Sequence, residues 1–363
     1  MKITFVLPNL RLYGGIKSTI QMADALQQLG HDVTIAHPLI EGRDGQPWWK
    51  PRKTAVQAAR LAQNLIKPPR WFNFSGTLLA IPYCSERFLP DADVLVLTWW
   101  ADVAKLHNIN ECKGKVVHFV RSYETWGGPK ALVNEVYGLN IPRICNSKAL
   151  SAQLPHESLC AITNGLDDIF VTDHPAKSQT TRLNIGVLYR QQGWKRMNDA
   201  LAVLTNIKRE NTGVRFILFG ESIRPEHEPL IKALRDCEYH QLPAGKALLK
   251  VYQEIDIFLF TSDETEAFGN PPLEAMAVGC AVVATKVGAI PDYSVHAESA
   301  LHCEPRDVKT MTSSIQRLID DPGLRLGLGT TAKTAAQAHR WINQAEKLEA
   351  VLKTMTTDHH SEA

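Results

Sequence analysis

Residues 261–285 read TSDETEAFGNPPLEAMAVGCAVVAT, and this stretch decides the fold. The apolar run before it predicts a buried strand that ends at Thr261. Pro271 and Pro272 suit the first turn of a helix, because the N–H groups that proline lacks are unpaired there anyway. Gly279 suits the C-terminal end of that helix, and another apolar run follows at once. The order strand, loop, helix, strand is typical of a parallel sheet covered by helices.

The same alternation extends along the chain in both directions. In the first half, a helix is expected at 15–29, and strands are expected at 3–7, 33–36, 94–98, 116–120, 143–145 and 159–162. In the second half, strands are expected at 183–189, 214–219, 255–260, 281–284 and 301–303. Helices between those strands are expected at 197–209, 226–236, 245–253 and 272–278. Each half therefore predicts one doubly wound α/β domain.

The length of 363 residues also suits two domains. We place the N-terminal domain at 1–165 and the C-terminal domain at 166–340, with the polar stretch 172–181 near the junction. The fold class is then α/β, with two Rossmann-like domains that face a central cleft. Open α/β sheets bind ligands at the carboxyl ends of their strands, so the cleft is the expected site.

Composition narrows the classes of function. The formal charge of +2 gives no field that would select nucleic acid as a partner. Seven cysteines without a CxxC pair are typical of free thiols in a reducing cytosol. The N-terminal apolar run is too short for a signal peptide, and no run of about 18 apolar residues could span a membrane. A cytoplasmic location is expected.

The loop before the helix at 272–278 predicts an anion site. A helix N-terminus at the carboxyl end of a strand presents N–H groups and a positive dipole end. Glu266 and Glu274 flank this position, and carboxylates there need another task, such as accepting hydrogen bonds from sugar hydroxyls. An ordinary turn with two exposed acids explains the pattern equally well on physical grounds alone.

Residues 266–274, EAFGNPPLE, resemble the E-x7-E motif of family 4 glycosyltransferases, and AMAVGCAVVA continues the likeness. Further resemblances cover nearly the whole chain, at 13–15, 29–33, 146–148, 162–167 and 339–352. The resemblance implies the GT-B fold, with a last segment, 341–363, that carries a helix back to the N-terminal domain. It also implies a retaining transferase that needs no metal and no cofactor, with a nucleotide diphosphate sugar as donor substrate.

The resemblance assigns roles to residues of the C-terminal domain. Arg190 and Lys195 have the family's spacing, and they offer a guanidinium fork and a point charge to the diphosphate. Tyr189 and Arg196 depart from the family, which has glycine at both positions. Glu266 would hold donor-sugar hydroxyls, and the other donor-binding positions are Phe268, Gly269, Asn270, Leu273 and Glu274, the last of these for the ribose.

Further residues of the N-terminal domain have implied roles. Gly14 and Gly15 would let the backbone approach phosphate and acceptor. His118, placed at a strand end, would touch the donor sugar, although a buried structural histidine is the alternative. Arg121 and Glu124, which are candidates for the acceptor site, lie in a segment that resembles the bacterial rhamnosyltransferase-like branch, which suggests a hexose or deoxyhexose donor. The acceptor would be a saccharide of a bacterial surface polysaccharide or glycolipid.

Two other functions fit the same sequence. A nucleotide-sugar epimerase would share the fold, and a binding protein could have kept the fold and lost catalysis.

Residues 47–83 contain no acid but carry Lys50, Arg52 and Lys53 beside aromatic residues, with a helix expected at 54–66. This pattern suits a peripheral site on an anionic membrane and a lipid-linked acceptor. A helix packed on the sheet with a solvated basic edge explains it as well.

Overall fold

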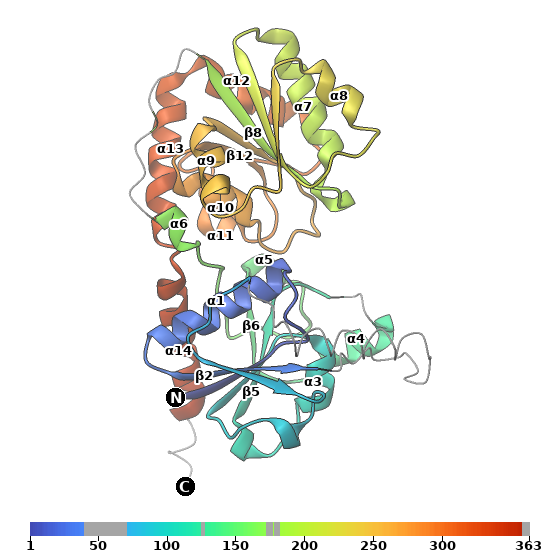
Figure 1. The fold of residues 1–363 in the computed structure, drawn as a ribbon, viewed down its shortest axis with the longest axis vertical. Helices are drawn as coiled ribbons and strands as arrows, with labels where there is room; N and C mark the ends of the chain where they lie inside the picture. Colours follow the sequence, from blue (N-terminus) through green and yellow to red (C-terminus); the bar gives the residue numbers. More distant parts are fainter. Residues whose placement is uncertain (40–70, 125–127, 172–176, 178–181, 358–363) are drawn as a thin grey trace. The chain divides into compact units, whose positions relative to one another are not determined.

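A computed structural model of the chain describes residues 1–39, 71–124, 128–171, 177 and 182–357. The chain divides into two compact units (Figure 1). Unit 1 consists of Met1–Gly165 together with Trp341–Ala363, and unit 2 consists of Leu166–Arg340. Each unit is built around one parallel sheet with helices on both faces.

Unit 1 contains a seven-stranded parallel sheet of order β3-β2-β1-β4-β5-β6-β7. Its strands are β1 (Lys2–Val6), β2 (Asp32–Pro38), β3 (Thr77–Ile81), β4 (Val94–Leu97), β5 (Lys115–Val120), β6 (Arg143–Cys145) and β7 (Cys160–Ala161). The central strands are buried on both faces, and they are therefore continuous runs of apolar residues.

Two long helices cover one face of this sheet, α1 (Gly14–Gln28) and α14 (Trp341–Thr357). In α1, Ile16, Ile20 and Ala23 recur at helical spacing and pack against the strands. The last helix thus belongs to the same core as the first strands, as the resemblance implied. The other face is covered by α3 (Trp100–Leu106), α4 (Lys130–Tyr137) and α5 (Lys148–Ser151).

Unit 2 contains a six-stranded parallel sheet of order β10-β9-β8-β11-β12-β13. Its strands are β8 (Leu183–Tyr189), β9 (Val214–Gly220), β10 (Cys237–Gln241), β11 (Ile257–Phe260), β12 (Ala281–Thr285) and β13 (Leu301–Cys303). One face is covered by α7 (Met197–Glu210), α8 (Glu228–Ala233) and α12 (Val308–Asp320). The opposite face is covered by α6 (Asp168–Val171), α9 (Lys246–Glu254), α10 (Asn270–Ala277), α11 (Ile290–Tyr293) and α13 (Pro322–Gln337).

Each sheet has one point where the strand order reverses, between β1 and β4 in unit 1 and between β8 and β11 in unit 2. Ligands of open α/β sheets bind outside the carboxyl ends of the strands at such a point. In unit 2, the loop after β8 carries Arg190 and Lys195, and the loop after β11 carries Glu266. The topology therefore brings these two loops to the expected place.

The predicted fold class is confirmed. The observed elements differ from the expected ones at the edges of the sheets and at the ends of one helix. Two strands at sheet edges were missed, β3 and β10; β10 has no continuous apolar run, whereas β3 has a short one that is mostly exposed. The helix expected at 226–236 is shorter, Glu228–Ala233, and Arg235 follows it with a φ of 62°, outside helical space. Among the described residues, no helix is long and apolar enough to cross a membrane.

Candidate functional site

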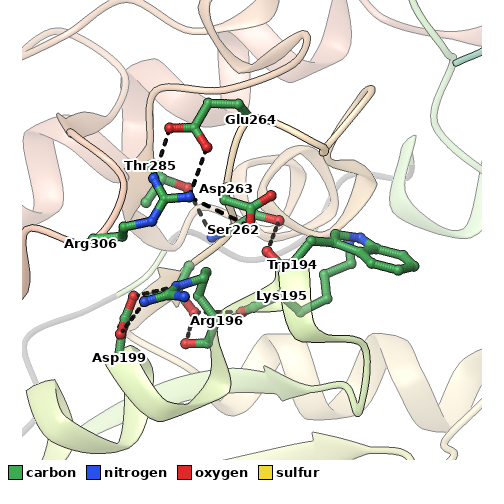
Figure 2. Close-up of polar contacts among 10 residues, drawn as sticks. Trp194, Lys195, Arg196, Asp199, Ser262, Asp263, Glu264, Thr285 and Arg306 are labelled. Atoms are coloured by element: carbon green, nitrogen blue, oxygen red, sulfur yellow. Dashed lines mark hydrogen bonds and ion pairs between the residues drawn. The ribbon is translucent and has the colours of Figure 1, made fainter. Parts of the chain in front are cut away.

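The loops that follow β8 and β11 are hydrogen-bonded to each other (Figure 2). The carbonyl oxygen of Trp194 lies 2.8 Å from the donating N–H nitrogen of Asp263 and 3.0 Å from the hydroxyl of Ser262. The hydroxyl of Thr261 donates to the carbonyl of Lys195 at 3.0 Å. These contacts fix the backbone on both sides of the expected diphosphate site. Trp194 and Lys195 belong to η3 (Gly193–Lys195), a single turn of 3₁₀ helix.

Lys195 and Glu266 form an ion pair between the two loops. Their side chains are 18% and 11% exposed, so water screens the pair only partly. The hydroxyl of Ser262 lies 3.0 Å from Glu266 Oε2 and 3.0 Å from the carbonyl of Trp194, so its one hydrogen serves one acceptor at a time. The ammonium group also lies 5.5 Å from the ring centroid of Phe260. Lys195 is therefore held at the end of β11 beside a carboxylate that it could exchange for a phosphate.

Arg190 is held by a different carboxylate. Its Nη1 lies 3.1 Å from Oε1 of Glu221, which follows β9. Glu221 also accepts hydrogen bonds from the N–H of Gln191 at 3.0 Å and from Nε2 of Gln192 at 3.2 Å. Burial raises the pKa of Glu221, but these hydrogen bonds and the guanidinium outweigh it and hold that pKa below its ordinary value. The carboxylate is thus ionised at neutral pH and orients the loop that carries Arg190.

Both departures from the family pattern have structural consequences. Tyr189 is buried at the end of β8, where its hydroxyl lies 2.7 Å from Nδ1 of His227 and accepts the N–H of Arg224 at 2.9 Å. Arg196 has φ 51° and ψ 42°, the left-handed region that glycine occupies without cost. Its guanidinium binds Asp199 through Nε at 2.8 Å and through Nη2 at 3.1 Å (Figure 2). The chain keeps the backbone shape that the family glycine would give at this position.

The N-terminus of α10 has no side-chain cap and no acid in its first turn. Gly269 precedes the helix with a φ of 89°, and its carbonyl accepts the hydroxyl of Tyr293 at 2.7 Å. Pro271 and Pro272 carry no N–H group, so Asn270 and Leu273 supply the first-turn amides. The helix end is therefore positive, which favours an anion.

Gly288 is a site residue that the sequence did not reveal. A Cβ atom there would lie 2.6 Å from the carbonyl oxygen of Glu266, and the φ of 55° is also in the left-handed region. The glycine lets the loop of Glu266 approach the turn before α11. A glycine in a loop gives no signal of such a contact, because the contact joins distant parts of the chain.

The two acids of the E-x7-E motif have different partners. Glu274 lies on α10 and accepts the hydroxyl of Tyr252 at 2.8 Å. Tyr252 is fully buried, and burial together with the carboxylate of Glu274 raises the pKa of its hydroxyl. Phe268 is buried, and its ring packs against Tyr293 with centroids 5.5 Å apart. Glu266 thus belongs to the loop contact with Lys195, whereas Glu274 is anchored to the core of unit 2.

Arg306 holds the other side of the Glu266 loop (Figure 2). Its Nη1 and Nη2 donate to the two carboxylate oxygens of Glu264 at 2.8 and 3.0 Å. This guanidinium lowers the pKa of Glu264 to about 2. Behind the loop, the N–H of Ser262 donates to the hydroxyl of Thr285 at 3.0 Å. The loop is therefore supported from β12 and from the turn after β13.

In unit 1, the structure corrects the position of His118. The residue lies within β5 and not at its end, and it is 1% exposed. Its ring packs over Tyr137, with centroids 5.6 Å apart. Burial, with a contribution from Arg143, lowers the pKa of His118 to about 3, so the ring is neutral. In this structure a sugar could reach His118 only if its neighbours moved, and its catalytic role stays a prediction.

Three other predicted residues of unit 1 lie near the start of α1. Gly14 and Gly15 form the first two positions of α1, and a Cβ atom on either would meet nothing within 4 Å. Arg121 is buried and donates through Nη2 to Ser18 and Asn164. Glu124 is partly buried. Lys50, Arg52, Lys53 and the helix expected at 54–66 lie outside the described residues.

A known family matches the chain over unit 2. The family model for "Glycosyl transferases group 1" matches residues 180–321, which include the loops after β8 and β11. These matched residues contain Arg190, Lys195, Glu266 and Glu274. The match supports a group 1 glycosyltransferase.

Curated relatives are similar over part of the chain. The glycogen synthase of Mycobacterium tuberculosis is 25% identical over 171 residues, which are 45% of this chain and 40% of that protein. The D-inositol 3-phosphate glycosyltransferase of Corynebacterium diphtheriae is 35% identical over 104 residues, which are 29% of this chain and 24% of that protein. The chain thus covers less than half of the length of these relatives.

Solved structures extend the likeness to the whole fold. The HepE protein of Anabaena, crystallised in complex with UDP-glucose, superposes with a TM-score of 0.70 at 16% identity. The match covers 98% of this chain and 100% of that one. The fold of the chain is therefore GT-B, with both Rossmann-like units included.

Proposed function

We propose that this protein is a group 1 glycosyltransferase, a retaining enzyme of family 4 that moves a hexose or deoxyhexose from a nucleotide diphosphate sugar to a saccharide acceptor. The observation that carries the proposal is the contact between the loops after β8 and β11, where Lys195 meets Glu266. Both residues lie within the matched family region. The complexes of HepE with UDP and UDP-glucose support a nucleotide sugar as donor.

The arrangement suits charge stabilisation of a leaving diphosphate. As the bond between the sugar and the diphosphate breaks, negative charge grows on the phosphate oxygen, and preorganised cations lower the barrier. Arg190, Lys195 and the N-terminus of α10 would supply this charge. The acceptor oxygen forms the new bond to the same sugar carbon, and its proton passes to the departing phosphate oxygen. No side-chain nucleophile is needed for this step, which leaves the configuration of the sugar carbon unchanged.

Glu266 and Glu274 would then orient the donor. Once Lys195 turns toward the phosphates, Glu266 has oxygens free to accept hydrogen bonds from sugar hydroxyls. Glu274 would accept from the ribose while Tyr252 holds its other oxygen. Because both carboxylates are fixed by protein donors before the donor binds, they would select its geometry at little entropic cost.

Two finer assignments rest on the sequence. The rhamnosyltransferase-like segment around Arg121 and Glu124 favours a deoxyhexose donor and a bacterial surface polysaccharide or glycolipid as product. The basic segment with Lys50, Arg52 and Lys53 favours a lipid-linked acceptor at an anionic membrane surface. Co-sedimentation with anionic and neutral liposomes tests the membrane contact, which high salt and charge reversal of these three residues should abolish.

The central test is incubation with a panel of nucleotide sugars, read by mass spectrometry. Free nucleotide diphosphate and a glycosylated product that form only when a saccharide acceptor is present are expected. Conversion of the donor to an epimeric sugar would instead identify an epimerase. Binding of a nucleotide sugar without turnover, over a broad panel of acceptors, would identify a protein that kept the fold and lost catalysis.

A further inference from the structure

A buried guanidinium lies at the carboxyl edge of the sheet in unit 1. Arg121 follows β5 on the same face as Phe119, and its guanidinium carbon lies 4.8 Å from the centroid of that ring. This face is the one that α1 covers. Nη2 of Arg121 donates to the hydroxyl of Ser18, which itself donates to the carbonyl of Gly14 at 2.8 Å. Arg121 therefore reaches the first turns of α1.

The charge of Arg121 has no ionic partner among the residues that the structure describes. The residue is 7% exposed, and its Nε and Nη1 have no hydrogen-bond partner within the described parts of the chain. Arg121 also forms no salt bridge with any carboxylate of those parts. Burial lowers the pKa of Arg121 to about 9, which still leaves it charged at pH 7. An unpaired buried charge is strongly unfavourable unless an anion compensates for it.

The acid that follows in sequence does not supply the missing charge. Burial raises the pKa of Glu124 to about 8, and the charge of Asp102 adds to the rise, whereas Arg121 opposes it. At pH 7 the carboxyl of Glu124 is therefore mostly protonated. A neutral carboxyl does not compensate for the guanidinium.

The N-terminus of α1 adds donors to the same place. Its N-cap residue, Tyr13, makes no side-chain hydrogen bond to the helix, and the first turn contains no acid. Since a Cβ atom on Gly14 or Gly15 would meet nothing within 4 Å, the space beside the first amides is open. An uncapped helix start and a guanidinium together are the usual elements of a phosphate site.

We infer that Arg121 and the first turn of α1 bind a phosphate group of the acceptor. This inference rests on the proposed glycosyl transfer, and it deepens that proposal by assigning the acceptor a negative charge. The diphosphate of the donor already has two cations and a helix N-terminus in unit 2. A neutral saccharide would leave the buried guanidinium uncompensated, whereas a phosphate would supply the missing negative charge and an acceptor for an unused N–H group.

Binding of methyl phosphate to the full chain tests the site without turnover. The double variant Arg190→Ala, Lys195→Ala removes the cations of unit 2 and serves as the background. Calorimetry or ³¹P NMR should detect methyl phosphate binding to this background, and adding Arg121→Ala should weaken that binding at least tenfold. Adding Arg121→Lys should restore part of it. Binding that is absent from the background, or that Arg121→Ala leaves unchanged, would overturn the site.

A surface substitution keeps the test valid if Arg121→Ala fails to fold. Gly14→Asp places a carboxylate in the open first turn of α1, where it favours the helix dipole but repels an anion. In the same background, the melting temperature should stay equal or rise while methyl phosphate binding falls at least tenfold. The matched neutral variant, Gly14→Asn, should retain binding within threefold. Equal binding by the Asp and Asn variants would contradict the inference.

Nucleotide affinity separates the two possible sources of phosphate. If the site takes the acceptor, Arg121→Ala alone should change the affinity for the free nucleoside diphosphate less than twofold. A tenfold loss would mean that the site takes the donor, and the acceptor assignment would be wrong. If the nucleotide-sugar panel gave no transfer while Arg121-dependent methyl phosphate binding persisted, the proposed function would fail and the anion site would stand.

Discussion

The carboxyl edges of the two sheets carry their cations in different ways. In unit 2, Lys195 lies beside Glu266 and Arg190 lies beside Glu221, so each cation has an ionic partner in the absence of a ligand. In unit 1, Arg121 is buried against Ser18 and Asn164, which are neutral. A paired cation is held in place but must exchange its partner when a phosphate arrives. An unpaired buried cation gains its first ionic partner from the ligand.

This difference predicts how substitutions act. In unit 2, loss of a cation also leaves a carboxylate without its partner, so the site becomes negative where a diphosphate should bind. In unit 1, loss of the guanidinium removes a charge that has no ionic partner, so binding of an anion should fall without leaving a carboxylate unpaired. Substitutions in the two units therefore test this contrast.

The largest effect is expected from the cations of unit 2. Arg190→Ala and Lys195→Ala should each lower kcat by about 10²–10³, the scale for one preorganised donor to a developing charge. Circular dichroism should stay native, because neither side chain is part of a core cluster. Arg209→Ala, at the exposed C-terminal end of α7, is the matched control and should leave kcat unchanged. Activity within threefold of the wild type in both site variants would refute the role of these cations.

Substitutions of the two acids of the motif should have different effects, because one acid is expected to bind the donor sugar and the other the ribose. Glu266→Gln should lower turnover roughly 10-fold to 100-fold, the range for one hydrogen bond to a charged group. Glu274→Gln should instead weaken binding of the free nucleoside diphosphate by about tenfold, because its expected partner is the ribose. Calorimetry with the nucleotide and steady-state kinetics distinguish the two. Unchanged nucleotide affinity in Glu274→Gln would remove the ribose role.

The sequence predicted the topology because buried parallel strands are apolar along their whole length. Strands β8 and β11 needed no more than that signal, and the order of strands and helices then placed Arg190, Lys195 and Glu266 on neighbouring loops. The edge strand β10 was missed because it has no apolar run, and β3 was missed although it has a short run, of which only Ile81 is buried. Apolar runs therefore indicate central strands more clearly than edge strands.

The partners of the site residues could not be predicted in the same way. Glu221 follows β9, and its contact with Arg190 depends on the register of two strands that are far apart in sequence. Arg306 and Gly288 support the loop of Glu266 through contacts of the same kind. His118 was placed at a strand end from its apolar neighbours, but β5 continues two residues further and buries the ring.

A smaller effect is expected in the dependence of stability on pH, with opposite signs in the two units. The folded state raises the pKa of Glu124 from its ordinary 4.5 to about 8, so the folded state binds more protons than the unfolded one between these values. Stability from this group is therefore full below pH 4.5 and falls as the pH rises toward 8. Glu124→Gln should remove that fall, as measured by melting temperature against pH.

Glu264 in unit 2 should behave in the opposite sense. Arg306 lowers its pKa from 4.5 to about 2, so its contribution is present above pH 4.5 and is lost as the pH falls toward 2. Because the pair is exposed, the change should be modest and weaker at high salt. Glu264→Gln should flatten the melting temperature in this acidic range alone. A Glu264→Gln effect between pH 5 and 8, or a Glu124→Gln effect confined below pH 4, would contradict the assignment of opposite signs.

The smallest effect, no change, is expected when metal ions are removed. Enzymes that bind a diphosphate through Mg²⁺ or Mn²⁺ use the ion to neutralise charge that grows on the leaving group. In unit 2, that charge would meet Lys195, Arg190 and the uncapped N-terminus of α10, so an ion would have little left to neutralise. Initial rates of transfer should therefore be equal before and after treatment with EDTA, and added Mn²⁺ should not raise them. A Mn²⁺-dependent glycosyltransferase assayed in the same buffer controls for complete chelation. Complete loss of activity that Mn²⁺ restores would show that the cations of unit 2 do not suffice for the diphosphate.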